Sequence, residues 1–431
     1  MSSDSCRLAD IADIQGGYAF KSADFGSSGV AVVKIANIQP PNVVLDAADR
    51  VEQHKLEGLT RFELADGDIL MAMTGATVGK VARLRKTERA FLNQRVARIS
   101  AKDDPELNDF IYALVSQPGF DKQIESAAAG SAQANISAAG IGAVVIPSLD
   151  RDTQLVIGSI ARSIDDRITL LRETNATLEA IAQALFKSWF VDFDPVRAKA
   201  EGRPPEGMDA TTASLFPDSF EESELGLVPK GWGIGCVGDL ASQKKGSVNP
   251  LASPGVLYEH YSLPAFDSGQ APVFELGKEI KSNKTPLPEE AVLLSKLNPH
   301  IPRVWLPVSH GVNAVCSTEF LAYSPQGGAS KELIYCLFSS DTFQQQLCQL
   351  VTGTSNSHQR VKPDQVLAVK LPIADKPALR AFTEIVRPLF DRVHAGRLQA
   401  QTLTQLRDTL LPRLISGQLR LPATTECKDA E

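Results

Sequence analysis

Ile111-Tyr112-Ala113-Leu114-Val115 in the first half of the chain matches Ile334-Tyr335-Cys336-Leu337-Phe338 in the second half, and this match decides the fold. At the same offset of about 223 residues, Ile69–Met71 matches Val292–Leu294. Later matches are offset by about 225 residues because the second copy holds two extra residues. The units of a solenoid repeat about every 20–50 residues, so this much longer period predicts two similar domains in one chain.

The composition predicts a folded chain without a metal or disulfide framework. Of 431 residues, 43% are hydrophobic, which is enough to build cores. The six cysteines form no CxxC pair. The amino terminus has no basic and apolar leader pattern and no window approaches 18 apolar residues, so we expect no membrane partner and a cytoplasmic location. The net charge of −7 argues against a simple nucleic-acid binder.

Each domain is expected to mix strands and short helices. In the first domain, alternating apolar runs and turn residues predict a sheet with few helices. The predicted strands are Val30–Ile38, Ile69–Met73, Val78–Leu84, Phe91–Ile99 and Ile141–Ile146, and the predicted helices are Asp109–Val115 and Phe120–Ala129.

A long helix is predicted after the first domain. Residues 151–191 contain no proline, and their apolar residues follow a heptad pattern. Asn175 occupies an a-type position of this pattern, where a buried amide fixes the register of the helices at some cost in stability. A related pattern at residues 376–417 predicts a second long helix, although Gly396 and Arg407 interrupt it. Pro388 and Pro412 are expected to start, kink or end helical segments.

We call the apolar face of these two helices the helix seam, and we expect it to mediate helix packing or subunit contact. The alternative is ordinary packing of one helix on its own domain. The predicted seam residues are Ile164, Ile168, Leu171, Asn175, Leu178, Leu185, Trp189, Leu389, Val393, Leu403 and Leu410.

These observations predict two α/β (α+β) domains in a pseudo-twofold arrangement, separated by two long antiparallel helices that form a coiled-coil-like spacer. The proline- and glycine-rich residues between the first helix and the second domain are expected to form an extended, partly ordered linker. The predicted segments are 1–150 (first domain), 151–191 (central helix), 192–231 (linker), 232–375 (second domain), 376–417 (distal helix) and 418–431 (polar tail).

The sequence contains no motif with the residues and spacing that a known catalytic site requires. The loop Gly75–Lys80 is one residue shorter than a phosphate-binding GxxxxGK[ST] loop, and Val81 stands where that motif needs a hydroxyl for magnesium. A strand-to-strand turn that offers backbone amides and Lys80 to a DNA phosphate fits better. The six histidines show no metal-ligand spacing. We therefore expect a binding protein rather than an enzyme.

Two features indicate nucleic acid as the ligand. The basic segment, residues 80–98, has seven basic residues and one acidic residue, although nearby acids such as Asp66 and Asp68 could balance it as a solvated surface. Polar loops at 130–135 and 353–360 occupy equivalent places in the two copies, either as solvated loops or as readers of base edges. The candidate DNA-binding residues are Thr74, Thr77, Lys80, Arg83, Arg95, Ser131, Gln133, Asn135, Lys244, Lys245, Lys296, Arg303, Thr354, Asn356, His358, Gln359 and Arg360.

The chain resembles the specificity subunit of type I restriction–modification systems. The most specific local match is the helix end Leu178–Val196, which is similar to the central region of that family. Supporting matches are Leu410–Gly417, Thr74–Lys80 and Pro229–Trp232.

The resemblance implies two target-recognition domains that read the two halves of a bipartite double-stranded DNA sequence. It implies as partners two methylation subunits and, in the full complex, restriction subunits. The chain itself is then no enzyme and holds no cofactor, because S-adenosylmethionine, ATP and magnesium belong to the partners. Two alternatives stay open: an assembly scaffold without a target of its own, and a stand-alone DNA-acting enzyme.

Overall fold

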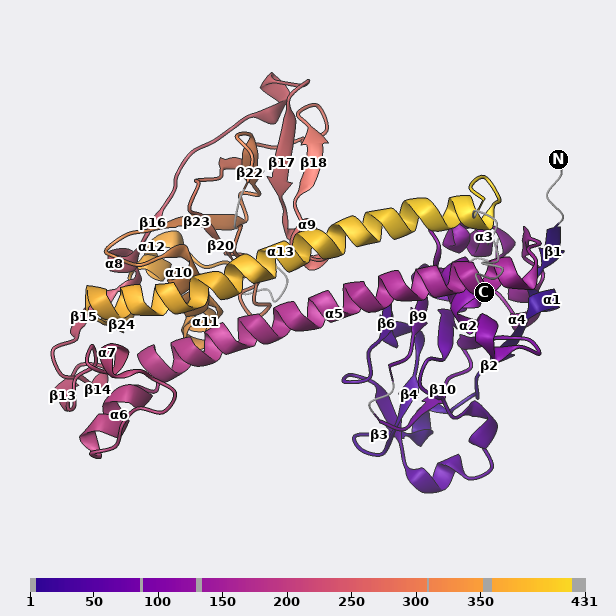
Figure 1. Cartoon of the computed structure of the whole chain (residues 1–431), viewed down its shortest axis with the longest axis horizontal. Helices are drawn as coiled ribbons and strands as arrows, with labels where there is room; N and C mark the ends of the chain where they lie inside the picture. Colours follow the sequence, from indigo (N-terminus) through magenta and orange to yellow (C-terminus); the bar gives the residue numbers. More distant parts are fainter. Residues whose placement is uncertain (1–4, 86–87, 129–133, 308–309, 352–358, 421–431) are drawn as a thin grey trace, which may run out of the picture. The chain divides into compact units, whose positions relative to one another are not determined.

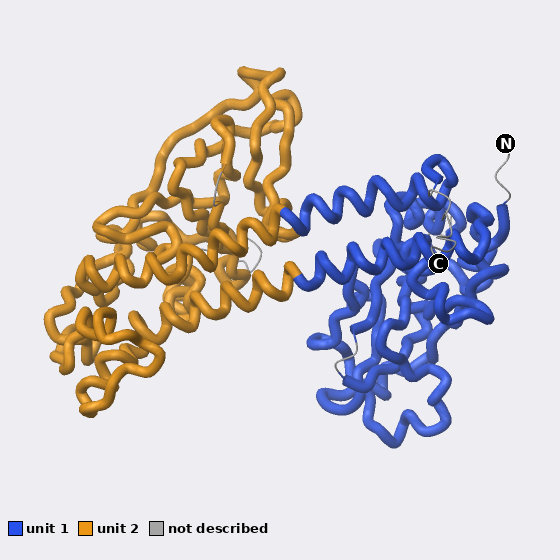
Figure 2. The backbone as a smooth tube through the Cα atoms, viewed as in Figure 1, with its two compact units in different colours: residues 1–170, 399–431 blue, residues 171–398 orange. Residues whose placement is uncertain are grey.

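The chain divides into two compact units, each of which holds part of both long helices. The computed structural model describes residues 5–85, 88–128, 134–307, 310–351 and 359–420. Unit 1 comprises residues 1–170 and 399–431, and unit 2 comprises residues 171–398 (Figure 2). The boundaries of the two units lie inside the long helices rather than at their ends.

The two long helices run antiparallel. They are α5 (Arg151–Phe190) and α13 (Lys376–Ile415), with 40 residues each (Figure 1). In unit 1, Ile157 near the start of α5 shares a hydrophobic core with Leu414 near the end of α13. In unit 2, Phe186 near the end of α5 packs on Phe382 near the start of α13, with ring centroids 6.0 Å apart. The helices therefore pair in opposite directions.

Helix α13 is unbroken through both of its internal prolines. Pro388 and Pro412 lie within the helix, so the expectation that they start or end helical segments is wrong. A proline inside a helix destabilises the helix by about 3 kcal/mol. Burial of one large apolar side chain stabilises the folded state by about 1.5–3 kcal/mol. Pro388 is exposed, whereas Val386 and Phe390 beside it are buried in the core of unit 2. Tertiary packing therefore outweighs the local preference.

The described residues of unit 1 form three sheets. Their strand orders are β1-β12, β10-β4-β7-β3 and β2-β11-β8-β9-β6-β5. The strands are β1 (Ser5–Arg7), β2 (Ala12–Gly16), β3 (Phe25–Gly26), β4 (Val30–Val33), β5 (Ile38–Gln39), β6 (Asn42–Val43), β7 (Asp49–Val51), β8 (Ile69–Ala72), β9 (Val81–Arg83), β10 (Ala90–Leu92), β11 (Val96–Ala101) and β12 (Val145–Pro147). The helices besides α5 and α13 are α1 (Leu8–Ile11), α2 (Asn108–Ser116), α3 (Phe120–Ala127) and α4 (Ala138–Gly142).

In unit 2, the residues that the structure describes form four sheets. Their strand orders are β13-β14, β15-β24, β16-β23-β20-β21 and β18-β17-β22-β19. The strands are β13 (Phe220–Ser223), β14 (Gly226–Pro229), β15 (Gly233–Cys236), β16 (Ala241–Gln243), β17 (Leu257–Tyr261), β18 (Val273–Leu276), β19 (Thr285–Pro286), β20 (Val292–Ser295), β21 (Val304–Trp305), β22 (Ala314–Cys316), β23 (Phe320–Pro325) and β24 (Lys370–Ile373). The helices are α6 (Asp194–Ala200), α7 (Ala210–Ala213), α8 (Val237–Leu240), α9 (Leu263–Asp267), α10 (Lys331–Ser339), α11 (Asp341–Gln349) and α12 (Pro363–Leu367).

The two units share one topology. The order β2-β11-β8-β9 in unit 1 is repeated as β16-β23-β20-β21 in unit 2. The parallel pair β4 and β10 is repeated as β17 and β22. The order α2, α3, α4, β12, α5 is repeated as α10, α11, α12, β24, α13. The predicted fold class, two α/β domains with two long antiparallel helices, is therefore confirmed.

Several predicted strands are shorter than expected because side chains cap local turns. The expected strand Val30–Ile38 ends at Val33, where Asn37 Oδ1 accepts a hydrogen bond from the Lys34 amide at 2.8 Å. The first part of the expected strand Ile141–Ile146 is instead the end of α4. Ser137 caps the amino terminus of this helix, because its hydroxyl oxygen accepts a hydrogen bond from the Gly140 amide. Asparagine and serine favour such caps and turns over continued strands.

The segment 192–231 is more ordered than its composition predicts. It forms α6, α7 and the hairpin β13–β14, and it belongs to unit 2. Phe193, Val196 and Phe216 join the hydrophobic core of that unit. Phe216 packs edge-on against Trp189 of α5, with ring centroids 5.0 Å apart. A few aromatic side chains therefore anchor a segment that proline and glycine alone mark as a linker.

The two interruptions of the helix seam have structural partners. Asn175 on α5 is buried, and a Cβ atom added at Gly396 on α13 would lie 2.4 Å from its side-chain oxygen Oδ1. Glycine at 396 therefore leaves the space that the amide fills. Arg407 forms ion pairs with Asp165 and Asp408, both at 2.8 Å.

The predicted seam residues face the packed side of the helices. Among them Ile168, Leu171, Asn175, Trp189 and Val393 are buried. The half-buried seam residues are Ile164, Leu178, Leu185, Leu389, Leu403 and Leu410.

Candidate nucleic-acid interface

In unit 1, the end of β8 gathers three segments that are far apart in the sequence. The Ala72 amide donates to the Lys80 carbonyl at 2.9 Å, and the Met73 amide donates to the Arg95 carbonyl at 2.9 Å. The Ile136 amide donates to the Met73 carbonyl at 3.0 Å. We call the main chain of residues 72–80, 95 and 134–136 frame 1.

Frame 1 places several of the predicted DNA-binding residues together. Thr74 pairs with Asn135 through a β-bridge, and the Thr77 hydroxyl donates to the Thr74 carbonyl at 3.4 Å. Lys80, Arg95 and Asn135 are exposed. Within the described part of the chain, neither Lys80 nor Arg95 forms an ion pair. Two cations and one amide therefore face solvent from one backbone frame, a combination suited to phosphate and base contacts.

Unit 2 repeats this frame bond by bond. The Ser295 amide donates to the Arg303 carbonyl at 2.9 Å, and the Lys296 amide donates to the Glu319 carbonyl at 3.0 Å. The Val361 amide donates to the Lys296 carbonyl at 3.0 Å, and Leu297 forms a β-bridge with Arg360. We call the main chain of residues 295–303, 319 and 359–361 frame 2.

The side chains on the two frames differ in charge. Arg303 takes the place of Lys80, and its guanidinium binds both carboxylate oxygens of Asp267, at 2.7 and 2.9 Å. The Arg303 side chain is only 13% exposed. Glu319 takes the place of Arg95, so frame 2 carries an acid where frame 1 carries a base. The placement of Arg303 therefore gives no support to the prediction that it binds DNA.

Frame 2 also holds Arg360, in the place of Asn135. Its Nε and Nη2 donate to the two carboxylate oxygens of Glu319 at 3.1 and 3.2 Å. Hydrogen bonding to Glu319 raises the pKa of Arg360. Gln359 is half-buried, and its carbonyl accepts from the Asn298 amide at 2.8 Å.

Most arginines of the basic segment are paired with acids. Arg83 donates to Asp109 of α2 at 2.8 Å, and its guanidinium lies 4.3 Å from the centre of the Tyr112 ring. Burial raises the pKa of Tyr112 to about 12. Arg89 pairs with Glu63 at 2.8 Å, and Arg98 pairs with Asp68 at 3.5 Å. Acids close in space therefore balance the charge of these arginines.

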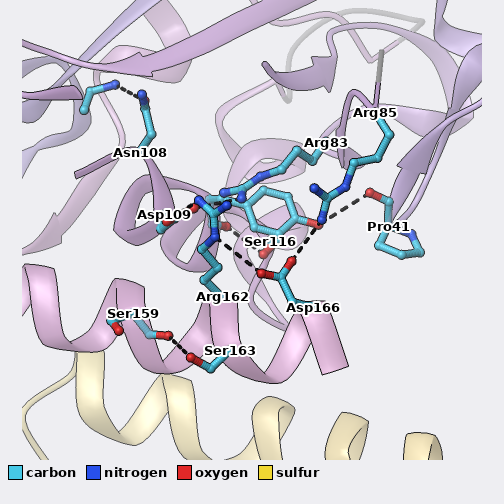
Figure 3. Close-up of polar contacts among 12 residues, drawn as sticks. Pro41, Arg83, Arg85, Asn108, Asp109, Ser116, Ser159, Arg162, Ser163 and Asp166 are labelled. Carbon is cyan, nitrogen blue, oxygen red and sulfur yellow. Dashed lines mark hydrogen bonds and ion pairs between the residues drawn. The ribbon is translucent and has the colours of Figure 1, made fainter. Parts of the chain in front are cut away.

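An ion-pair chain joins this region to α5 (Figure 3). Asp109 lies between Arg83 and Arg162, and its two carboxylate oxygens are 2.8 and 3.1 Å from their guanidinium groups. Asp166 lies between Arg162 and Arg85, at 3.4 and 3.1 Å. Arg83 is only 13% exposed, and its guanidinium is held in this chain of contacts. Its placement therefore gives no support to the prediction that it binds DNA.

The remaining candidate residues divide into two groups. Lys244 and Lys245 are exposed after β16, and Lys296 is half-buried on frame 2. The predicted contacts that lie outside the described residues are Ser131, Gln133, Thr354, Asn356 and His358.

The loop Gly75–Lys80 has a packing explanation. Gly79 has a φ of 81°, and a Cβ atom there would lie 3.0 Å from the Asp121 Cα of α3. A side chain at this position would strain the backbone and crowd the helix. The glycine therefore needs no bound phosphate to explain it.

Sequence reasoning missed the acids that hold the arginines of unit 2. Asp267 and Glu319 are 36 and 41 residues from their partners, so no local pattern pairs them. The internal repeat offered a signal for Glu319, because it lies about 224 residues after Arg95.

No cluster that could hold a metal ion occurs among the described residues. In the same part of the chain, no helix is long and apolar enough to cross a membrane.

Comparison with known families gives a match in the first part of the chain. The family described as "Type I restriction modification DNA specificity domain" matches residues 3–180. These residues are similar to that domain. The match covers β1 to most of α5 and includes all of frame 1. The resemblance seen in the sequence is thereby confirmed.

Curated relatives extend the similarity beyond the first domain. The type I restriction enzyme HindI specificity subunit of Haemophilus influenzae is 25% identical over 317 residues, which cover 63% of this chain and 68% of the relative. The MjaIX specificity subunit of Methanocaldococcus jannaschii is 24% identical over 346 residues, covering 76% and 73%. The relatives are specificity subunits, the class for which the sequence predicted a non-enzymatic role.

A solved structure shows the same fold over almost the whole chain. The S subunit of a type I restriction–modification system from M. genitalium superposes with a TM-score of 0.57 at 15% sequence identity. The alignment covers 97% of this chain and 96% of that protein. Since the identity is low, the similarity concerns the fold alone.

Proposed function

We propose that this chain is the DNA-recognition subunit of a type I restriction–modification complex and that its two domains read the two halves of a bipartite target. The chain recruits two methylation subunits and, in the full complex, restriction subunits. Methylation of adenine, DNA cleavage, and the S-adenosylmethionine, ATP and magnesium that these reactions need all belong to those partners.

One observation carries this proposal. Frames 1 and 2 have the same main-chain hydrogen bonds, yet Lys80, Arg95 and Asn135 of the first are Arg303, Glu319 and Arg360 in the second. A fixed backbone with exchanged side chains is what two readers of different base sequences require, because base edges are distinguished by hydrogen-bond donors and acceptors.

Domain replacement tests the bipartite reading. Residues 1–150 are replaced by the equivalent domain of a relative with a known target, and methylated adenines are mapped by single-molecule sequencing of host DNA. We expect one half of the methylated motif to change and the other half to stay. A motif in which both halves change, or neither changes, contradicts the proposal.

The alternative role of an assembly scaffold has one observation in its favour. In unit 2, Arg303 and Arg360 are both paired with carboxylates, which reduces the charge available to DNA phosphate. A scaffold without a target would give the same methylated motif, or none, whichever domain replaces residues 1–150. The same experiment therefore separates the two roles.

A further inference from the structure

Main-chain hydrogen bonds hold Glu319 and Arg360 close together, independently of the contact between their side chains. Lys296 donates its amide to the Glu319 carbonyl at 3.0 Å, and its own carbonyl accepts from the Val361 amide at 3.0 Å. The neighbouring Leu297 forms a β-bridge with Arg360. Both residues are thus fixed to the same two positions after β20.

The contact between the side chains fixes the plane of the guanidinium. Nε and Nη2 of Arg360 donate to separate oxygens of Glu319 at 3.1 and 3.2 Å. Two parallel hydrogen bonds leave a planar guanidinium little freedom to rotate. The Arg360 side chain is 44% exposed and that of Glu319 is 26% exposed. The arginine is therefore both oriented and accessible from solvent.

The pair occurs where the two copies differ. The equivalent residues on frame 1 are Arg95 and Asn135, which cannot form this contact. Since the main-chain hydrogen bonds are the same in both frames, the difference lies in the side chains and is not required by the backbone. An asparagine matches the edge of adenine in the major groove, and an arginine matches the edge of guanine.

We propose that Glu319 is a positioning residue that orients Arg360 to read a guanine in the half-site bound by the second domain. This inference rests on the proposed function. Surface ion pairs contribute only about 0–1 kcal/mol to stability, so fold stability gives little reason for the pair. An arginine that is already oriented loses less conformational freedom when it forms two hydrogen bonds to guanine O6 and N7.

The test compares five single variants of the full chain, expressed with its methylation subunits: Glu319→Ala, Glu319→Gln, Arg360→Ala, Arg360→Lys and Glu224→Ala. Methylated adenines are mapped in host DNA, and the half-site of the second domain is identified by domain replacement. We expect Arg360→Ala and Arg360→Lys to lower the preference for one G·C base pair on the order of tenfold. Glu319→Ala should lower the same preference, and Glu319→Gln should retain more of it.

Arg360→Lys separates base reading from phosphate contact, because lysine keeps the charge but loses the planar fork. Glu224→Ala is the matched control, because it breaks the Lys370–Glu224 pair, whose side chains are 56% and 54% exposed in the same unit. It should leave the motif unchanged. Melting temperatures confirm that each variant folds.

Three outcomes overturn the inference, and only the third also overturns the proposed function. If the wild-type chain directs methylation to a two-part motif and the Glu319 and Arg360 variants leave that motif unchanged, the positioning role is wrong and the proposed function stands. The same holds if Arg360→Lys behaves as wild type while Arg360→Ala weakens all sequences equally. If the wild-type chain yields no two-part motif, the proposed function fails and this inference with it.

Discussion

Among the described residues of the basic segment, Lys80 and Arg95 have the placement that best suits direct contact with DNA phosphate. Both are exposed on frame 1, and neither forms an ion pair within the described part of the chain. We expect Lys80→Ala and Arg95→Ala to weaken binding to all DNA sequences. Each should reduce the slope of log affinity against log salt by about one unit, because one phosphate contact is lost.

Binding titrations of the complex at several salt concentrations measure that slope. Lys122→Ala, which removes an exposed lysine on α3 of the same unit, is a suitable control and should leave the slope unchanged. A loss of binding confined to sequences that differ at one base pair would instead make Lys80 or Arg95 a base reader.

Arg83 and Arg85 differ in burial although they are two residues apart. Arg83 is 13% exposed and its partner Asp109 is 22% exposed, whereas Arg85 and Asp166 are 46% and 49% exposed. We expect Arg83→Ala to lower the free energy of unfolding of unit 1 by about 1–3 kcal/mol, because it leaves a half-buried carboxylate with one fewer partner. Arg85→Ala should cost less than about 1 kcal/mol.

Urea unfolding of both variants measures this difference. Equal losses for the two substitutions would show that burial of the Arg83–Asp109 pair contributes nothing beyond a surface ion pair. The prediction also separates the roles of arginines that the sequence presents as one basic run.

At the scale of the elements, the sequence predicted what depends on periodicity and missed what depends on distant partners. The heptad of α5 and the internal repeat gave both long helices and the shared topology. No local pattern could reveal that Arg303 forms an ion pair with Asp267. Nor could it reveal that Phe216 packs on Trp189 and so anchors the segment after α5. For the candidate site, Lys80, Arg95 and Asn135 were named from the sequence, but the backbone frame that joins them required the structure.

The contact between the long helices offers a stringent test of packing. A Cβ atom at Gly396 would lie 2.4 Å from Asn175 Oδ1, so Gly396→Ala forces the buried amide to move. We expect this variant to lose about 1–3 kcal/mol of unfolding free energy in unit 2, as is usual for overpacking. Asn175→Ala together with Gly396→Ala should recover part of the loss, because the added methyl group then has space.

Thermal or urea unfolding of the two single variants and the double variant gives the coupling energy. We expect at least about 0.5 kcal/mol of recovery, the level at which contacting residues cease to be additive. Additive losses would mean that the helices adjust around the methyl group without involving Asn175.

At the scale of the whole molecule, the charge balance predicts dependence on the partners. The chain has a net charge of −7, and most arginines of the basic segment are paired with acids. We expect the chain alone to bind DNA at least on the order of tenfold more weakly at physiological salt than the chain with its methylation subunits, because DNA affinity depends largely on neutralised phosphates.

Fluorescence anisotropy with one labelled duplex, measured with and without the methylation subunits, tests this expectation. The duplex carries the methylated motif found in host DNA, and a duplex with a scrambled motif serves as the control. Equal affinity in both states would show that this chain supplies the electrostatic attraction unaided.

The fit between Asn175 and Gly396 has a consequence for engineering. The amide lies on α5 and the space for it lies on α13, about 220 residues later in the chain. A breakpoint near residue 150 leaves both residues in the parent sequence, so a hybrid protein inherits a matched pair. A breakpoint beyond residue 175 separates them and can place the amide opposite a larger side chain. The position of the join, and not only the choice of donor, then determines whether a hybrid with new specificity folds.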